Sequence, residues 1–155
     1  MVGSKPTKLK ILSTALIVVS CLLSVSSVAH PDAKGVVKER MVTMKALASS
    51  MKALSQVKSG KMPIAASSKI SEKIIELSKL IPEQFPAGTY SFPSEASPKI
   101  DSERARFERI AARLGEAAST IPKIAQARDL KKFTSSFRDI GKTCSACHKA
   151  FRVKR

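Results

Sequence analysis

The sequence is poor in several residue types that would point to other kinds of protein. It contains no tryptophan, one tyrosine, three cysteines and two histidines in 155 residues. So few cysteines argue against a disulfide scaffold, and so few histidines and cysteines leave a four-ligand zinc site short of ligands. No stretch alternates apolar and polar residues as a half-buried strand does, which argues against a β fold. The chain is also short of acid, with 12 acidic against 28 basic residues.

The N-terminus has the pattern of an export signal. Three lysines precede a charge-free apolar run over residues 11–29, which ends in Ser27-Val28-Ala29, a small-x-small cleavage pattern. We therefore predict a cleaved signal peptide over residues 1–29 and one periplasmic domain over residues 30–155. A membrane anchor is the alternative. A second alternative is a lipid on Cys21, which closes a lipoprotein-like Val18-Val19-Ser20-Cys21 box.

The charge of the mature domain limits its partners. Removal of the first 29 residues takes away three lysines and no acid, which leaves 25 basic and 12 acidic residues, a net charge of +13. Such a charge raises the question of nucleic acid, but an exported protein meets no genome. We expect instead an acidic protein partner, with membrane contact at most peripheral. The plainer interpretation is that most of these lysines form a solvated basic surface.

Four stretches have the period of about 3.6 residues that is typical of a helix. They cover roughly residues 34–59, 64–81, 99–121 and 125–153, with prolines at 63, 82, 98 and 122 near their ends. Their apolar stripes are Val37, Met41, Met44, Ala48 and Met51; Ile70, Ile74, Leu77 and Ile81; Phe107, Ala111, Leu114, Ala118 and Ile121; and Leu130, Phe133, Phe137, Ile140, Cys144, Cys147 and Phe151. These apolar stripes predict an all-α fold, an antiparallel four-helix bundle. The connection over residues 82–98 carries three aromatic residues, so we expect it to fold over the core.

Cys144-Ser145-Ala146-Cys147-His148 is a C-x-x-C-H sequence, the signature of c-type haem attachment. The two thiols can form thioether bonds to a porphyrin, and the histidine that follows can present an imidazole nitrogen to its iron. A thioredoxin-like redox pair would follow a strand, and none is visible. A zinc site would need more ligands than the mature chain offers. The remaining alternative is that the C-x-x-C-H sequence occurs by chance. We predict one haem c, bound through Cys144, Cys147 and His148 near the C-terminus of the last helix.

This arrangement resembles the class II c-type cytochromes, the cytochrome c-prime family, over nearly the whole mature chain. The resemblance is carried by Arg40-x-x-x-Met44, by Ser97-Pro98-Lys99-Ile100, by Ala105-Arg106-Phe107 and above all by the segment from Gly141 through the C-x-x-C-H motif to Lys154. One departure is Asp101, which stands where many members carry a tryptophan. The resemblance implies a four-helix bundle with the haem inside it, as a monomer or a homodimer.

The resemblance also places the residue that faces the iron opposite His148. In this family it lies on the first helix: a methionine there is typical of a low-spin electron carrier, and a bulky apolar residue leaves iron open to nitric oxide or carbon monoxide. Here the position is Met44, with Met41 as the next candidate and core packing as the alternative role. We predict a monohaem electron carrier between redox proteins, not an enzyme, with gas binding as the alternative. Arg40 and Arg152 are candidate haem contacts, Arg40 to a propionate; for either, an exposed arginine without haem contact is the alternative.

Overall fold

The computed structural model describes residues 33–153 of the chain. The predicted signal peptide over residues 1–29 and Cys21 lie outside the described residues. Within them the helices are α1 (Gly35–Lys58), α2 (Ala66–Leu80), α3 (Lys99–Ser102), α4 (Arg104–Ser119), α5 (Ile121–Gln126) and α6 (Leu130–Phe151). The part of the chain that the structure describes forms no strand; its one β-type contact is an isolated bridge between Ala96 and Arg152.

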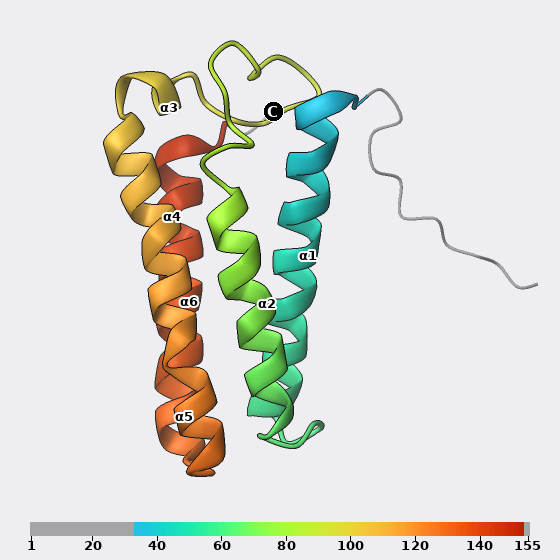
Figure 1. The fold of residues 1–155 in the computed structure, drawn as a ribbon, viewed down its shortest axis with the longest axis vertical. Coiled ribbons are helices and arrows are strands. Elements are labelled where there is room, and N and C mark those ends of the chain that lie inside the picture. Colours follow the sequence, from blue (N-terminus) through green and yellow to red (C-terminus); the bar gives the residue numbers. More distant parts are fainter. Residues whose placement is uncertain (1–32, 154–155) are drawn as a thin grey trace, which may run out of the picture.

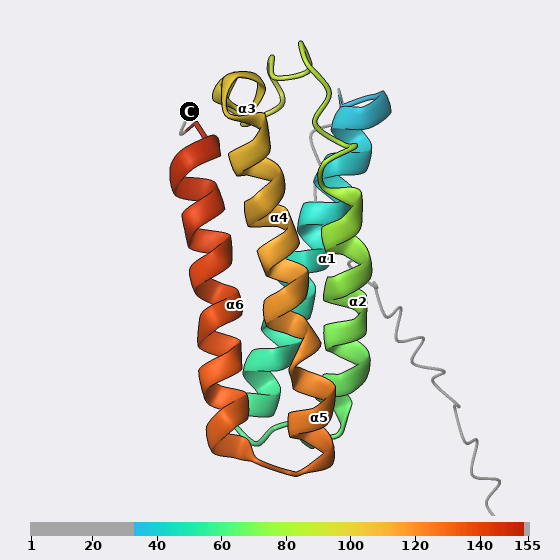
Figure 2. The same cartoon turned by 60° about the vertical axis from the view of Figure 1, so that its left-hand side comes forward.

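The helices form an antiparallel four-helix bundle, as predicted (Figure 1). Helix α1 runs from the upper end of the bundle to the lower one, α2 returns, α4 and α5 run down together, and α6 returns (Figure 2). The α2–α4 connection therefore crosses the end of the bundle at which α1 begins and α6 ends. Over residues 33–153, none of these helices combines the length and the apolar character needed to cross a bilayer.

Helix α4 buries the face that its apolar spacing predicts. All five stripe residues of this segment are buried, namely Phe107, Ala111, Leu114, Ala118 and Ile121. Burying large apolar side chains of this kind stabilises a fold by roughly 1.5–3 kcal/mol each. The stripe of α6 is confirmed less completely: Phe133, Ile140 and Phe151 are buried, whereas Leu130 is 50% exposed because it is the first residue of the helix.

The boundary near Pro122 differs from the prediction. We expected a helix to stop at this proline, but α4 ends at Ser119 and Pro122 lies in the first turn of the short helix α5. A proline costs nothing there, because the first N–H groups of a helix have no partner within it. The last long helix consequently begins at Leu130 rather than near residue 125, with the carboxylate of Asp129 accepting a hydrogen bond from the Lys132 N–H at 2.9 Å.

Helix α1 buries a different face from the one predicted. Its buried residues are Arg40, Thr43, Leu47, Leu54 and Val57. The predicted stripe from Val37 to Met51 lies beside this face and borders a chamber inside the bundle, described below. The periodicity was therefore correct as a helix signal, and the assignment of that stripe to the core holds only in part: Met44 and Met51 are partly buried and pack against the core, whereas Ala48 is exposed.

Small residues let α2 and α4 approach closely. Ser67, Ser71 and Ser78 are buried on α2, and each hydroxyl donates to a carbonyl three residues earlier. Ser78 faces Gly115 of α4, where an added Cβ would lie only 2.7 Å from the Ser78 Oγ. The glycine therefore leaves the space that the serine hydroxyl occupies.

The connection between α2 and α3 folds onto the bundle, as expected. Phe85 and Tyr90 are buried, whereas Phe92 is 65% exposed, so two of the three aromatic side chains pack inward. The connection is also tied to the end of α6. The Ser97 N–H donates to the Phe151 carbonyl at 2.8 Å, and the Val153 N–H donates to the Glu95 carbonyl at 2.9 Å.

Candidate haem-binding site

The C-x-x-C-H motif lies in the last two turns of α6. Cys144 and Cys147 are half-buried and are not joined in a disulfide. Residues three apart share one face of a helix, so both thiols project from the same side of α6. The Arg152 N–H donates to the His148 carbonyl at 3.1 Å, which closes the final turn next to the motif. The end of α6 thus holds two thiols and an imidazole in fixed relation.

These side chains border a chamber of about 630 Å³ between the helices. The apolar stripe of α1 forms another part of its wall, and all five residues predicted for that stripe line it: Val37, Met41, Met44, Ala48 and Met51. Cys144, Cys147 and His148 line the same chamber. A cavity of this volume is within the range of cofactor pockets. The stripe on α1 faces this space along its whole length, and Met44 and Met51 also pack against the core.

Burial controls the protonation of the site. Burial raises the pKa of Cys147 to about 11, with a further contribution from Cys144, and it raises the pKa of Cys144 as well. Burial lowers the pKa of His148, and the positive charge of Arg152 lowers it further, while Glu95 opposes the shift. The imidazole is therefore neutral at pH 7, which is the form that binds a metal.

The donor set and the chamber fit a covalently attached haem. Two thiols lie on one wall with the imidazole one residue beyond them, and the wall of α1 carries three methionine side chains. Sulfur and imidazole nitrogen are the axial ligands of haem iron in many cytochromes. Among residues 33–153, no three His, Cys, Asp or Glu side chains lie close enough to hold a metal ion between them, which argues against the zinc alternative.

Arg40 is buried, with 4% of its surface exposed, so the alternative of an exposed arginine is wrong. Its guanidinium donates to the carbonyls of Gln84 and Thr89 at 2.9 and 3.0 Å, and to the hydroxyls of Ser94 and Thr89, both at 2.7 Å. It also lies 4.1 Å from the centre of the Phe85 ring. Burial lowers the pKa of Arg40, although a guanidinium remains charged.

The predicted contact of Arg40 with a propionate stays a prediction. Four of the five N–H groups of its guanidinium donate to the connection between α2 and α3, which leaves one for another partner. Arg40 nonetheless borders the chamber, as does Ser94, to which it donates. Its main structural effect is to hold part of the chamber wall in place.

Arg152 lies at the mouth of the chamber and is largely exposed. Its guanidinium pairs with the carboxylate of Glu95, and the Arg152 Nε donates to Glu95 Oε2 at 2.7 Å. Both residues border the chamber and a wider open depression next to it. The pair connects the α2–α3 connection to the end of the motif helix. The contact of Arg152 with haem stays a prediction.

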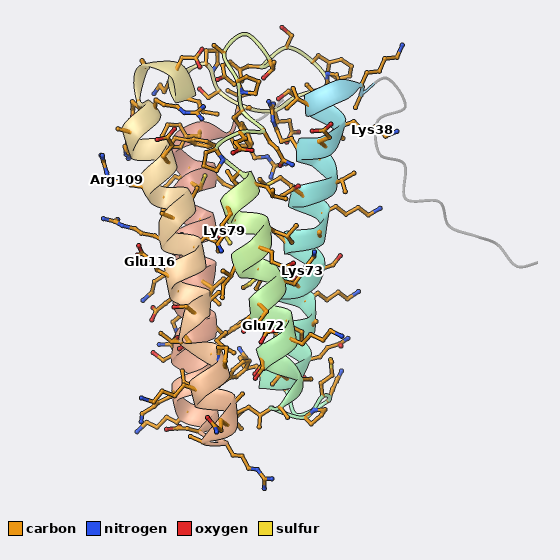
Figure 3. All side chains as sticks on the ribbon, in the orientation of Figure 1. Lys38, Glu72, Lys73, Lys79, Arg109 and Glu116 are labelled. Atoms are coloured by element: carbon orange, nitrogen blue, oxygen red, sulfur yellow. The ribbon has the colours of Figure 1, made fainter. Side chains whose placement is uncertain are left out.

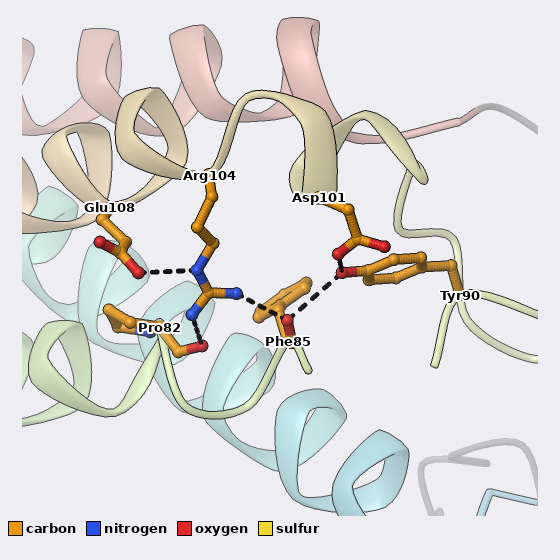
Figure 4. A network of polar contacts seen from close by, with 6 residues as sticks. All are labelled: Pro82, Phe85, Tyr90, Asp101, Arg104 and Glu108. Carbon is orange, nitrogen blue, oxygen red and sulfur yellow. Dashed lines mark hydrogen bonds and ion pairs between the residues drawn. The ribbon is translucent and has the colours of Figure 1, made fainter. Parts of the chain in front are cut away.

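Sequence reasoning missed a second arginine that holds the same connection. Arg104 of α4 donates to the Pro82 carbonyl at 2.6 Å and to the Phe85 carbonyl at 2.8 Å, and it pairs with Glu108 (Figure 4). In the same network the Tyr90 hydroxyl donates to Asp101, the residue at the family's tryptophan position. Burial and this hydrogen bond raise the pKa of Tyr90 to about 12. No sequence pattern relates these residues, because their partners are 11 to 22 positions away.

Comparison with known proteins agrees with this geometry. A family model described as Cytochrome C' matches residues 35–152. The chain is 32% identical to a cytochrome c' of Pararhodospirillum photometricum, over 80% of this chain and 99% of that protein. It is also 32% identical to a cytochrome c-556 of Agrobacterium tumefaciens, over 78% of this chain and 99% of that protein. Among solved structures, a nitric oxide complex of a mutant cytochrome c prime from Alcaligenes xylosoxidans is similar, with a TM-score of 0.68 and 30% identity over 77% of this chain and 94% of that one.

Proposed function

Because the chain belongs to the cytochrome c-prime family and carries one covalently attached haem c, we propose that it is a periplasmic electron carrier whose iron is held by His148 and Met44. The observation that carries this proposal is the position of Met44. Its side chain borders the chamber from α1, whereas Cys144, Cys147 and His148 border it from α6. A thioether from a different helix is thus available at the same chamber.

Each residue of the site has a separate task in this proposal. Cys144 and Cys147 hold the porphyrin through two thioether bonds, so that it cannot be lost outside the cell. His148 would supply a neutral imidazole nitrogen to the iron, and Met44 would supply a thioether. The bound haem supplies an iron that changes by one electron. We propose that the protein is a carrier and not an enzyme.

Met44 lies on a helix that the rest of the fold holds firmly. Arg40, one turn before it, is buried and hydrogen-bonded to the connection at the end of the bundle. Leu47, one turn after it on the core side, is buried as well. A ligand on such a helix moves little between redox states, and small rearrangement favours electron transfer.

Gas binding is the second candidate, and the relatives support it better than they support the first. The matching family model is described as Cytochrome C', and the similar Alcaligenes xylosoxidans protein has been solved as a nitric oxide complex. In that function Met44 would pack against the chamber without binding iron, and the sixth position would be open to nitric oxide or carbon monoxide.

The absorption spectrum distinguishes the two functions. We would record it for the oxidised and reduced holoprotein, with and without carbon monoxide, and repeat it on Met44→Ala. Met41→Ala and Met51→Ala are matched controls, because each removes another thioether from the same wall. We expect a low-spin spectrum that is indifferent to carbon monoxide until Met44 is removed, and no change in either control.

Two results would contradict this assignment. If the unmodified protein is high-spin and binds carbon monoxide, gas binding is the function and the fold is unaffected. If Met41→Ala opens the iron and Met44→Ala does not, the ligand is Met41, and the electron-transfer function stands with a different residue.

The partners of an electron carrier with this charge are proposed to be acidic redox proteins. The mature domain carries 25 basic and 12 acidic residues, so an acidic surface would be attracted over a distance of several ångströms at moderate salt. Transfer rates should then fall as salt is added. Either a monomer or a homodimer is compatible with this proposal.

A further inference from the structure

Exposed basic residues form two rows on two of the helices that line the chamber. On α1, Lys38, Lys45 and Lys52 are spaced by seven, which places them on one face of the helix. On α6, a second row consists of Arg138, Lys142 and Lys149, all exposed, and Arg152 continues it beyond the helix. The two rows belong to the two helices that carry Met44 and the C-x-x-C-H motif.

The row on α6 lies beside the chamber, and the row on α1 reaches the chamber wall at Lys45. Lys45 and Arg152 border the chamber itself. Arg138, Lys142, Lys149 and Arg152 border a neighbouring depression, which is open to solvent and has a volume of about 1270 Å³. The depression and the chamber share Met51, Glu95, His148 and Arg152 in their walls, so they lie side by side. The solvent-facing side of the site therefore carries more positive than negative side chains.

The face formed by α2 and α4 has a different charge pattern. Glu72, Lys73 and Lys79 project from α2, and Arg109 and Glu116 project from α4 (Figure 3). Both signs alternate over this face, and the amine of Lys73 pairs with Glu76 at 3.1 Å. The charge imbalance of the protein is thus concentrated on the α1 and α6 side.

Most of the basic side chains in the two rows have no acidic partner. Within residues 33–153, no carboxylate forms an ion pair with Lys45, Lys52, Arg138 or Lys149. Lys142 pairs with Asp139 at 3.0 Å, and Arg152 pairs with Glu95. Like charges within such rows repel each other, and an acidic surface placed across them would relieve that repulsion.

We propose that the two basic rows on α1 and α6 form a docking surface for the acidic face of a redox protein. This inference rests on the proposed electron-transfer function and specifies where its partner binds. A protein partner is favoured over a lipid surface because the α6 row lines a concave depression, which a complementary side chain can enter and a flat membrane cannot. The charges would mainly raise the association rate and orient the partner.

The test compares two charge-reversed holoproteins of equal net charge. K52E/R138E changes one residue of each basic row, and K79E/R109E changes one lysine and one arginine on the α2 and α4 face. All four side chains are exposed and outside the chamber wall. Binding to an immobilised poly-L-glutamate peptide is measured at several salt concentrations. We expect K52E/R138E to weaken binding about tenfold and to reduce its salt dependence, and K79E/R109E to weaken it less than twofold.

Equal weakening by both variants would overturn the proposal, because binding would then follow net charge and not location.

Binding of both variants to vesicles of phosphatidylglycerol tests the alternative that the surface binds a membrane. If K52E/R138E abolishes vesicle binding but leaves peptide binding unchanged, the surface serves a membrane and the proposal is wrong. The carbon monoxide response of both variants is recorded in parallel. It reports the function of the iron independently, so a failure of docking and a failure of electron transfer are distinguishable.

Discussion

Replacing Arg40 by methionine tests the account of the α2–α3 connection most directly. The substitution keeps an unbranched apolar stem in place of the aliphatic part of arginine and removes four hydrogen bonds to the connection, two of them to main-chain carbonyls. The carbonyls of Gln84 and Thr89 would then lose a buried donor, whereas the hydroxyls of Ser94 and Thr89 can turn to other partners. The contact of the guanidinium with the Phe85 ring would be lost as well.

The expected loss is large for a single substitution. A hydrogen bond to a charged group contributes about 1.5–3 kcal/mol, and such contributions are not additive within one network. With two carbonyls left without their donor, we expect Arg40→Met to lower the free energy of unfolding by about 3–4 kcal/mol. In a domain of this size that corresponds to a fall in Tm of roughly 10–15 °C.

The assay is urea unfolding of the holoprotein, followed by far-ultraviolet circular dichroism. Arg104→Met is the matched control, because Arg104 also donates to two carbonyls of the connection, while its side chain is 37% exposed. Water can replace part of what is lost there, so we expect a loss of about 1–2 kcal/mol. A loss below 1 kcal/mol for Arg40→Met would refute the reasoning. A change in the spectrum of the oxidised haem in Arg40→Met would support the predicted contact of Arg40 with a propionate.

Two further predictions concern helix packing and helix ends. Gly115→Ala should destabilise the protein by about 1 kcal/mol, because the new methyl group meets the Ser78 hydroxyl. The same change in a Ser78→Ala background should be neutral or stabilising, since alanine is a better helix former than glycine. A double-mutant cycle of thermal unfolding measures the difference, and equal effects in both backgrounds would contradict this prediction. Asp129 caps α6, and the hydrogen bond from the Lys132 N–H lowers its pKa; its contribution is therefore fully present above the ordinary aspartate pKa and is lost as the pH falls through the lowered value. The stability difference between the unmodified protein and Asp129→Ala should shrink in that acid range, and a difference that is constant with pH would show that the carboxylate charge plays no part.

Much of the fold could be predicted from the sequence, because helix periodicity and prolines are local signals. The stripe from Phe107 to Ile121 was correctly assigned to the core. Pro122 was taken as the end of a helix and proved to start one, since proline is compatible with both places and only the surrounding packing decides.

The site was predictable in part for the same reason. Cys144, Cys147 and His148 are adjacent in the sequence, and the structure places them together with Met44 around one chamber. The stripe around Met44 could not be recognised as a chamber wall, because an apolar side chain repeats with the same period whether it faces protein or a cofactor. The partners of Arg40 lie 44 to 54 residues away along the chain, so no local pattern could reveal them.

The way in which the two arginines hold the connection has a consequence for how this protein can diverge. Between them, Arg40 and Arg104 bind the main-chain carbonyls of Pro82, Gln84, Phe85 and Thr89. A carbonyl is present whatever side chain its residue carries, so substitutions at exposed positions of this segment leave the attachment intact. An insertion or deletion would move every carbonyl out of register with the guanidinium groups. Descendants of this gene should therefore tolerate drift in the composition of the segment far more readily than drift in its length.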